Sequence, residues 1–221
     1  MDQAYKSLQD QAYIHLKTMI QNDELCEGVI YSETKMAREL EISRTPFKAA
    51  LTRLSQDKYI DIIPSKGFRV HVLSEEDIKS TYQTRAAIEI YCALMVTEAR
   101  GTQDGQAAIR KMASSLDAMR SMVSDEDPEP FREQDRIFHT TLLAFCDNET
   151  FNELYEFSIY HQIVTASKGH RMSEQEKERT CEEHGQILEA IRTGSVEDCC
   201  GAVNRHMRSG MHSGLEYMEH H

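Results

Sequence analysis

The sequence lacks the features of a membrane protein or a secreted protein. It contains no stretch of about 18 consecutive apolar residues, the length that a membrane-spanning helix needs. Its first residues, MDQAYKSLQDQ, lack the basic segment followed by an apolar segment that marks a secretory signal. We therefore expect a cytoplasmic protein without membrane association. Its 6 cysteines include no Cys-x-x-Cys pair, and we expect them to be reduced thiols.

The chain also lacks the net positive charge that DNA-binding proteins often carry, because its net charge is −12. The charge is unevenly distributed: residues 1–73 hold 10 basic and 10 acidic residues, whereas residues 74–221 hold 15 basic and 27 acidic residues. Within residues 31–72, 8 basic residues outnumber 5 acidic residues, so the net charge there is +3. The N-terminal part therefore remains a candidate for DNA binding, and its modest charge favours a homodimer that reads two half-sites of a palindromic operator.

The segment Ile42–Leu54 reads ISRTPFKAALTRL and is predicted to form a helix with one free, cationic face. Ser43 can cap its N-terminus, and Pro46 is tolerated in a first turn because its missing N–H has no helical partner there. The residues at helical spacing that form the buried face are Phe47, Ala50, Leu51 and Leu54. The residues that lie off this face are Arg44, Thr45, Lys48 and Thr52. A short helix with Arg and Lys on its free face is suited to a DNA groove.

The neighbouring segments complete a winged helix-turn-helix. Residues 4–21 predict a first helix, and Ser32 can cap a short second helix. Residues 59–72, YIDIIPSKGFRVHV, are rich in β-branched and aromatic side chains and predict a β-hairpin with Lys66 and Gly67 in its turn. Any one of these pieces could belong to many folds, but their order is specific to a winged helix-turn-helix.

The segment SETKMARELEISRTPFKAALTRLSQDKYIDIIPSKGFRV resembles the DNA-binding domain of the GntR family of bacterial transcription regulators. The resemblance runs from about Ala12 to Val72 and implies a double-stranded DNA operator as the partner. It implies contacts with phosphates and bases from the recognition helix, and a wing whose glycine enters the minor groove. The residues that it places at the DNA are Ser43, Arg44, Thr45, Lys48, Lys66 and Gly67.

Everything after Leu73 is predicted to be helical. No glycine or proline interrupts the segment between Glu75 and Arg100, and Ser74 opens it with capping-box spacing. The predicted helices span residues 74–100, 106–123, 131–146, 147–166, 173–192 and 195–217. The fold class is therefore mainly α, with a winged helix-turn-helix DNA-binding domain over residues 1–73 and an all-helical bundle of six helices over residues 74–221.

Four polar residues of the predicted bundle point inward. Asp135 and His139 are four residues apart and share a helix face, while His184 and His206 each align with apolar residues of their own helices. His184 lies 10 residues before Gly194 and His206 lies 12 residues after it, so antiparallel helices would place them roughly 15 and 18 Å from the turn. Two imidazoles at one height, together with a helix that carries Asp and His four residues apart, make a metal site of three nitrogens and one oxygen, suited to zinc, nickel or another borderline divalent ion.

Simpler interpretations exist for each of these residues. Any single buried histidine is more often a hydrogen-bonded core residue than a metal ligand. Cys181, three residues before His184, is either a further soft ligand or a small buried apolar side chain. Arg85 falls in register with apolar residues and should point inward, where Glu89, four residues later, can neutralise it.

The segments LSEEDIKSTYQTRAAIEIYCA, DRIFHTTL, EEHGQILEAIRTGS and NRHM resemble the FCD effector domain of the FadR subfamily of GntR regulators. The resemblance implies a metal held by Asp135, His139, His184 and His206, and a cavity that Arg85 lines. It also implies a small carboxylate or sugar acid as the effector. Because the acidic helical domain cannot add to DNA affinity, we expect it to serve in dimerisation and sensing.

We therefore expect a metabolite-responsive bacterial transcription regulator, and not an enzyme. Two alternatives start from the same four residues. One is a regulator that senses the metal ion itself. The other is a metal-dependent hydrolase, which is less supported because no further carboxylate, Cys or Lys is evidently placed as a general acid or base.

Overall fold

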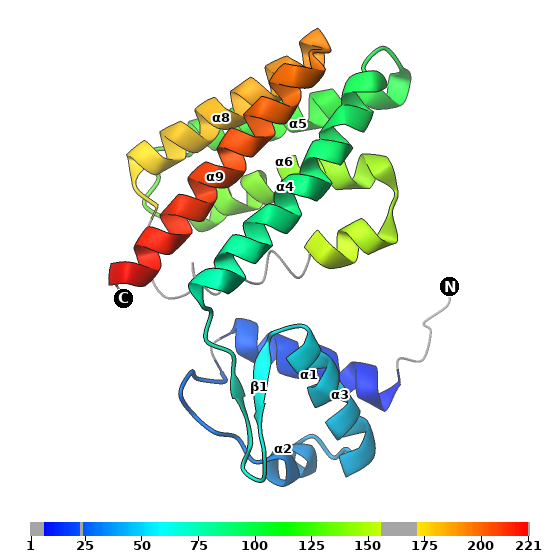
Figure 1. The fold of residues 1–221 in the computed structure, drawn as a ribbon, viewed down its shortest axis with the longest axis vertical. Helices are drawn as coiled ribbons and strands as arrows, with labels where there is room; N and C mark the ends of the chain where they lie inside the picture. The colour runs from blue at the N-terminus through cyan, green and yellow to red at the C-terminus, as the bar shows by residue number, and fades with distance from the viewer. Residues whose placement is uncertain (1–6, 23, 156–171, 221) are drawn as a thin grey trace. The chain divides into compact units, whose positions relative to one another are not determined.

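Helices make up most of the protein, and the strands of the described residues form one antiparallel pair (Figure 1). The computed structural model describes residues 7–22, 24–155 and 172–220. The chain divides into two compact units, Met1–Leu73 and Ser74–His221. The labelled elements are α1 (Leu8–Gln21), α2 (Glu33–Glu39), α3 (Arg44–Gln56), β1 (Ile60–Ile63), β2 (Gly67–Val70), α4 (Glu75–Glu98), α5 (Gln103–Ser121), α6 (Glu129–Cys146), α8 (Glu174–Thr193) and α9 (Val196–His220).

The first unit is a winged helix-turn-helix, as the sequence predicts. The apolar face of α3 is buried and packs against α1 and β1. β1 and β2 form the hairpin, with Ile60 opposite Val70 and Ile63 opposite Gly67. Tyr31 adds an isolated bridge to Phe68, so the segment before α2 closes over the hairpin. The recognition helix is thus fixed by apolar contacts on one side and left open on the other.

Ser43 corrects one detail of the prediction. It is the N-cap residue of α3, but its side chain makes no capping hydrogen bond. A capping serine accepts from the second or third backbone N–H of a helix. The third position here is Pro46, which has no N–H. One of the two backbone donors that a capping serine can use is therefore absent. Ser32 does cap α2, where its hydroxyl accepts from the N–H of Lys35 at 3.4 Å.

The second unit is a bundle of helices around one apolar core. α4 packs along α9, α5 packs against α6 and α8, and α8 packs against α9 (Figure 1). Predicted helix starts at Ser74 and Ser173 are confirmed, because both serines form capping boxes. Gly194 adopts φ +83° in the turn between α8 and α9, which confirms its predicted position at the end of a helix.

Among the boundaries that differ from the prediction are the starts of α5 and α6. α5 begins at Gln103 rather than at residue 106, because the Thr102 hydroxyl accepts from the N–H of Gly105. α6 begins at Glu129 with Pro130 in its first turn, where proline is tolerated. Of the predicted helix 147–166, residues 149–155 are helical, and its remainder lies outside the described residues. Over the described residues, no helix has both the length and the apolar character that crossing a bilayer requires.

Candidate functional site

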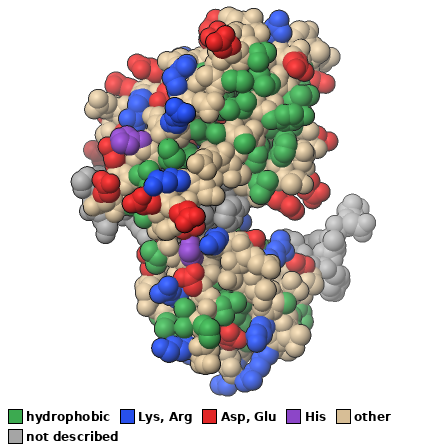
Figure 2. Space-filling view, viewed as in Figure 1, with side chains coloured by type: hydrophobic (Ala, Val, Ile, Leu, Met, Phe, Trp, Pro, Cys, Tyr) green, Lys and Arg blue, Asp and Glu red, His purple; other side chains and the backbone are tan. Residues whose placement is uncertain are grey.

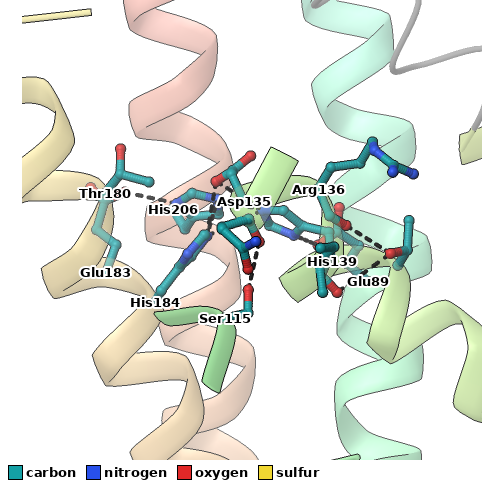
Figure 3. A network of polar contacts seen from close by, with 12 residues as sticks. Glu89, Ser115, Asp135, Arg136, His139, Thr180, Glu183, His184 and His206 are labelled. Atoms are coloured by element: carbon teal, nitrogen blue, oxygen red, sulfur yellow. Dashed lines mark hydrogen bonds and ion pairs between the residues drawn. The ribbon is translucent and has the colours of Figure 1, made fainter. Parts of the chain in front are cut away.

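The four predicted metal ligands converge in the core of the bundle (Figure 3). Asp135 and His139 come from α6, His184 from α8 and His206 from α9. The Nε2 atom of His184 lies 3.2 Å from that of His139 and 3.3 Å from that of His206, and the remaining Nε2 pair is 3.2 Å apart. Asp135 Oδ1 lies 3.5 Å from His184 Nε2. Cys181 is buried but contributes no donor atom to this cluster of described residues.

The spacing of these atoms fits a single small cation. Two nitrogen ligands at about 2.0–2.1 Å from a tetrahedral zinc ion lie about 3.3 Å apart, close to the separations of the Nε2 atoms. One oxygen and three nitrogens form a donor set that zinc, nickel and similar ions accept. The side chain of Asp135 is 26% exposed, whereas the histidines are buried, so solvent reaches the cluster beside Asp135.

Hydrogen bonds on the far side of two imidazoles favour the same conclusion. His139 Nδ1 is bonded to the carboxylate of Glu89, and His206 Nδ1 lies 2.8 Å from Glu183 Oε2. Each Nδ1 must therefore carry a proton, and in a neutral imidazole the Nε2 atom is then a bare acceptor. Two bare acceptors 3.2 Å apart repel each other unless positive charge lies between them. The cluster thus requires a cation, either a proton or a metal ion.

The pKa values of the cluster express this requirement. Burial lowers the pKa of His139, but Glu89 and Asp135 outweigh burial and raise it to about 9. Burial raises the pKa of Asp135, yet the hydrogen bond and charge of His139 hold it well below its usual range. Burial, followed by the charge of His206, lowers the pKa of His184 far below its ordinary value. The charges of neighbouring side chains therefore outweigh burial at His139 and Asp135, and a metal ion would compete with a proton at this cluster.

Three partners of the histidines were missed by sequence reasoning. Glu183 supports His206 on the neighbouring helix rather than His184 beside it, and Glu89 supports His139 across 50 residues of sequence. The ring of Phe138 stacks on His184, with centroids 4.1 Å apart and planes 3° apart. No helical spacing signals the two carboxylate contacts, because each joins side chains from different helices.

Arg85 points inward, as predicted, and its side chain is buried. Its Nε donates to Glu89 Oε1 at 2.9 Å, so the predicted counter-charge is confirmed. The rings of Tyr82 and Tyr155 lie 5.8 and 5.3 Å from the guanidinium carbon. Burial lowers the pKa of Arg85, but the negative charge of Glu89 and other neighbours raises it by more than burial lowers it. The guanidinium therefore stays charged. Its buried Nη2 is ion-paired with Glu89 Oε1 at 2.9 Å but makes no hydrogen bond to any residue that the structure describes.

The predicted DNA-contacting side chains lie on the open face of α3 and at the hairpin turn. Ser43, Arg44, Thr45, Lys48 and Lys66 are all exposed. Within the described part of the chain, none of the side chains of Arg44, Lys48 and Lys66 has a hydrogen-bond or ion-pair partner. In Figure 2, Lys and Arg side chains gather at the lower edge of this unit. The exposed face of α3 and the hairpin turn therefore present cationic side chains that are available to bind DNA.

Gly67 lies at the hairpin, and its contact with the minor groove stays a prediction. It is buried, has φ +134°, and an added Cβ would lie 2.0 Å from the carbonyl oxygen of Tyr31. A glycine is therefore required here for the close approach of Tyr31 to the hairpin. Lys66, next to it, is the exposed residue of the turn.

Comparison with known proteins agrees with both halves of this description. The family of bacterial regulatory proteins called gntR matches residues 8–70, and the FCD domain matches residues 80–209. The chain is 24% identical to the HTH-type transcriptional regulator YdhC of Bacillus subtilis (strain 168), over 95% of this chain and 90% of YdhC. It is 27% identical to the gluconate operon transcriptional repressor of Bacillus licheniformis, over 75% of this chain and 68% of the repressor.

A solved structure shares the fold. McbR/YncC of E. coli superimposes with a TM-score of 0.68 at 17% identity, over 96% of this chain and 98% of that protein. The chain belongs to the GntR family of bacterial regulatory proteins and carries a C-terminal FCD domain. It is a DNA-binding transcription regulator of the GntR type, and the families and relatives that it matches are regulators rather than enzymes, so they give the hydrolase alternative no support.

Proposed function

We propose that this regulator responds to a small organic acid, which binds beside a divalent metal ion held by Asp135, His139, His184 and His206. The observation that carries the proposal is the convergence of three Nε2 atoms at 3.2 and 3.3 Å, two of which are fixed as acceptors by carboxylates behind them. A bound divalent ion supplies a Lewis acid to which a carboxylate oxygen can coordinate. Zinc and nickel are the ions that the donor set favours.

Arg85 gives the acid a second point of attachment. Within the described residues, its buried Nη2 is ion-paired with Glu89 but has no hydrogen-bond acceptor, and a buried donor without an acceptor is costly. A carboxylate or hydroxyl of the acid would satisfy it, since guanidinium groups bind carboxylates strongly. One relative is named as the repressor of a gluconate operon, so a sugar acid such as gluconate is the first effector to test.

The first unit would bind the operator through α3 and the wing. Arg44 lies in the first turn of α3, where a guanidinium can reach guanine in the major groove. Ser43, Thr45, Lys48 and Lys66 would contact phosphates, and the backbone at Gly67 would set the position of Lys66. The operator would be a palindromic site in double-stranded DNA, and the protein would act in the cytoplasm. α4, which carries Arg85 and Glu89, begins at the residue after Ser74 and would transmit effector binding along the chain.

The regulator would act as a homodimer, because one winged unit offers few phosphate contacts. The second unit offers an apolar surface for this purpose: Tyr91 of α4 is 51% exposed and packs edge-on against Phe151, with ring centroids 5.6 Å apart. Leu154 is exposed nearby in sequence, and Figure 2 shows hydrophobic side chains gathered over the face that carries α4. Sedimentation should show a dimer that weakens in Tyr91→Glu, whereas a monomeric wild type would contradict the assignment.

The experiment that tests the proposed function is operator binding by metal-depleted and metal-loaded protein, with and without gluconate. We expect gluconate to change operator affinity only when the metal is present, with a coupling of about 1–3 kcal/mol. A change caused by the metal alone, with no further effect of any acid, would instead identify a metal sensor. Gluconate and related sugar acids without effect under any condition would remove the proposed effector class.

A further inference from the structure

Two carboxylates stand behind the histidines, and their surroundings differ. Glu183 is 16% exposed and, within the described residues, contacts His206 as its charged or hydrogen-bonding partner. Glu89 is 1% exposed and is divided between two partners. Its Oε1 accepts from Arg85, and its Oε2 is bonded to His139 Nδ1. Glu89 therefore joins the guanidinium that faces the acid to an imidazole of the metal centre.

We propose that Glu89 couples the acid to the metal ion, so that each increases the affinity of the protein for the other. This inference rests on the metal and acid sites proposed above. Glu89 acts as a positioning residue, because it would touch neither ligand and works through His139 and Arg85. The expected coupling is positive: binding of the acid increases the affinity for the metal ion. By linkage, binding of the metal ion increases the affinity for the acid by the same factor.

The physical reason lies in the sharing of one buried negative charge. Arg85 attracts the charge of Glu89 and so weakens Glu89 as an acceptor for His139. Among the described residues, Nη2 of Arg85 is ion-paired with Glu89 Oε1 at 2.9 Å but makes no hydrogen bond, so an acid bound to it would place a second negative charge against the guanidinium and loosen its hold on Glu89. More of the Glu89 charge would then stabilise His139 as a metal ligand, and interactions of this kind are strong where water is excluded.

The substitutions Glu89→Gln and Glu183→Gln distinguish coupling between the acid and the metal ion from a hydrogen bond that only orients a histidine. Arg85 and the protonated Nδ1 of His139 are both donors, so Glu89 must offer two acceptor oxygens, whereas a glutamine offers one. Glu89→Gln therefore leaves one partner facing an NH2 group in either orientation. Glu183→Gln can turn its oxygen to His206 and its NH2 group towards solvent, because Glu183 is partly exposed. The two variants make the same chemical change in a coupled and in an uncoupled position.

The experiment measures zinc affinity of the full chain by competition with a chromophoric chelator, in acetate and in chloride at equal ionic strength. Acetate serves as the probe anion, and its effect on the chelator alone is subtracted. We expect acetate to increase the zinc affinity of wild type and Glu183→Gln at least about fivefold. Glu183→Gln should lower zinc affinity by about tenfold without acetate, since it weakens the support of His206. In Glu89→Gln the increase with acetate should be clearly smaller than in wild type, because only direct coordination of acetate to the ion remains.

A second variant keeps the test valid if Glu89→Gln does not fold by circular dichroism. Arg85→Lys retains the charge but lacks the fork that holds Glu89 and an acid together, so it should bind zinc and show a smaller acetate effect than wild type. An equal acetate effect in wild type, Glu89→Gln and Arg85→Lys would overturn the coupling role, as would its absence in wild type. A wild type that does not bind zinc would instead overturn the metal centre itself.

Discussion

The open face of α3 and the polar cluster of the bundle place charged side chains in opposite environments. Arg44 and Lys48 are exposed, and neither side chain has an internal partner among the described residues. Arg85 and Glu89 are buried and hold each other. Exposed charges cost the fold almost nothing, whereas buried charges are costly unless they are paired. The difference teaches that the first region can change partners without affecting stability, while the second links ligand binding to the stability of the fold.

Glu89→Ala should give the largest effect in this comparison. The substitution leaves Arg85 buried without its counter-charge and removes the acceptor of His139. We expect a loss of about 3–5 kcal/mol in the free energy of unfolding of the second unit, measured by urea denaturation. The matched control is Glu183→Ala, whose partly exposed carboxylate should cost much less. Equal losses in the two variants would mean that burial of the Arg85–Glu89 pair is not the decisive difference.

Arg44→Ala should affect binding and leave stability almost unchanged. Its side chain is exposed on α3 and contributes nothing to the core. We expect a loss of about 1–3 kcal/mol in operator affinity with relaxed base preference, measured by fluorescence anisotropy on a selected operator. The free energy of unfolding should stay within about 0.5 kcal/mol of wild type. Lys48→Ala is the companion variant and should weaken binding evenly across sequences; unchanged operator affinity in Arg44→Ala would mean that α3 is not the recognition helix.

The smallest change in stability is expected from Asp61→Asn in the hairpin. The carboxylate of Asp61 is partly buried, between the two extremes of the comparison. Burial alone would raise the pKa of Asp61, but hydrogen bonds from His71 at 2.7 Å and Arg69 at 3.0 Å hold it below its usual range. Because the pKa is lower in the folded state, the stabilisation is present at neutral pH and is lost as pH falls through that lowered pKa. Asp61→Asn should cost about 0.5–1 kcal/mol at neutral pH and nothing in strong acid, measured by thermal unfolding across pH.

Local sequence rules predicted more of the fold and site than might be expected from one chain. Spacing of four residues placed Asp135 and His139 on one face, and similar distances from Gly194, 10 and 12 residues, placed His184 and His206 at nearly one level. These predictions needed only helix geometry and a tight turn. They succeeded because the site is built from the inward faces of straight helices.

The rest depends on packing between helices or on combinations of local rules. The contact of Glu89 with His139 joins α4 to α6, and no spacing within one helix encodes it. Serine is a good N-cap residue and proline is tolerated in the first turn of a helix, so each residue alone fits its position. Together they do not, because Pro46 has no N–H to donate to the Ser43 hydroxyl. Gly67 fitted a wing in the sequence, but its close approach to Tyr31 depends on a bridge between distant segments.

The most direct test of the account is metal analysis of purified wild type beside His184→Ala and His206→Ala. Circular dichroism and operator binding would serve as controls for the fold of the winged unit. The account predicts a divalent ion in wild type and at least about tenfold weaker metal binding in both variants, with zinc-dependent stabilisation lost in parallel. Equal metal content in all three proteins would contradict it, and the histidines would then be core residues that hold a proton rather than a metal ion.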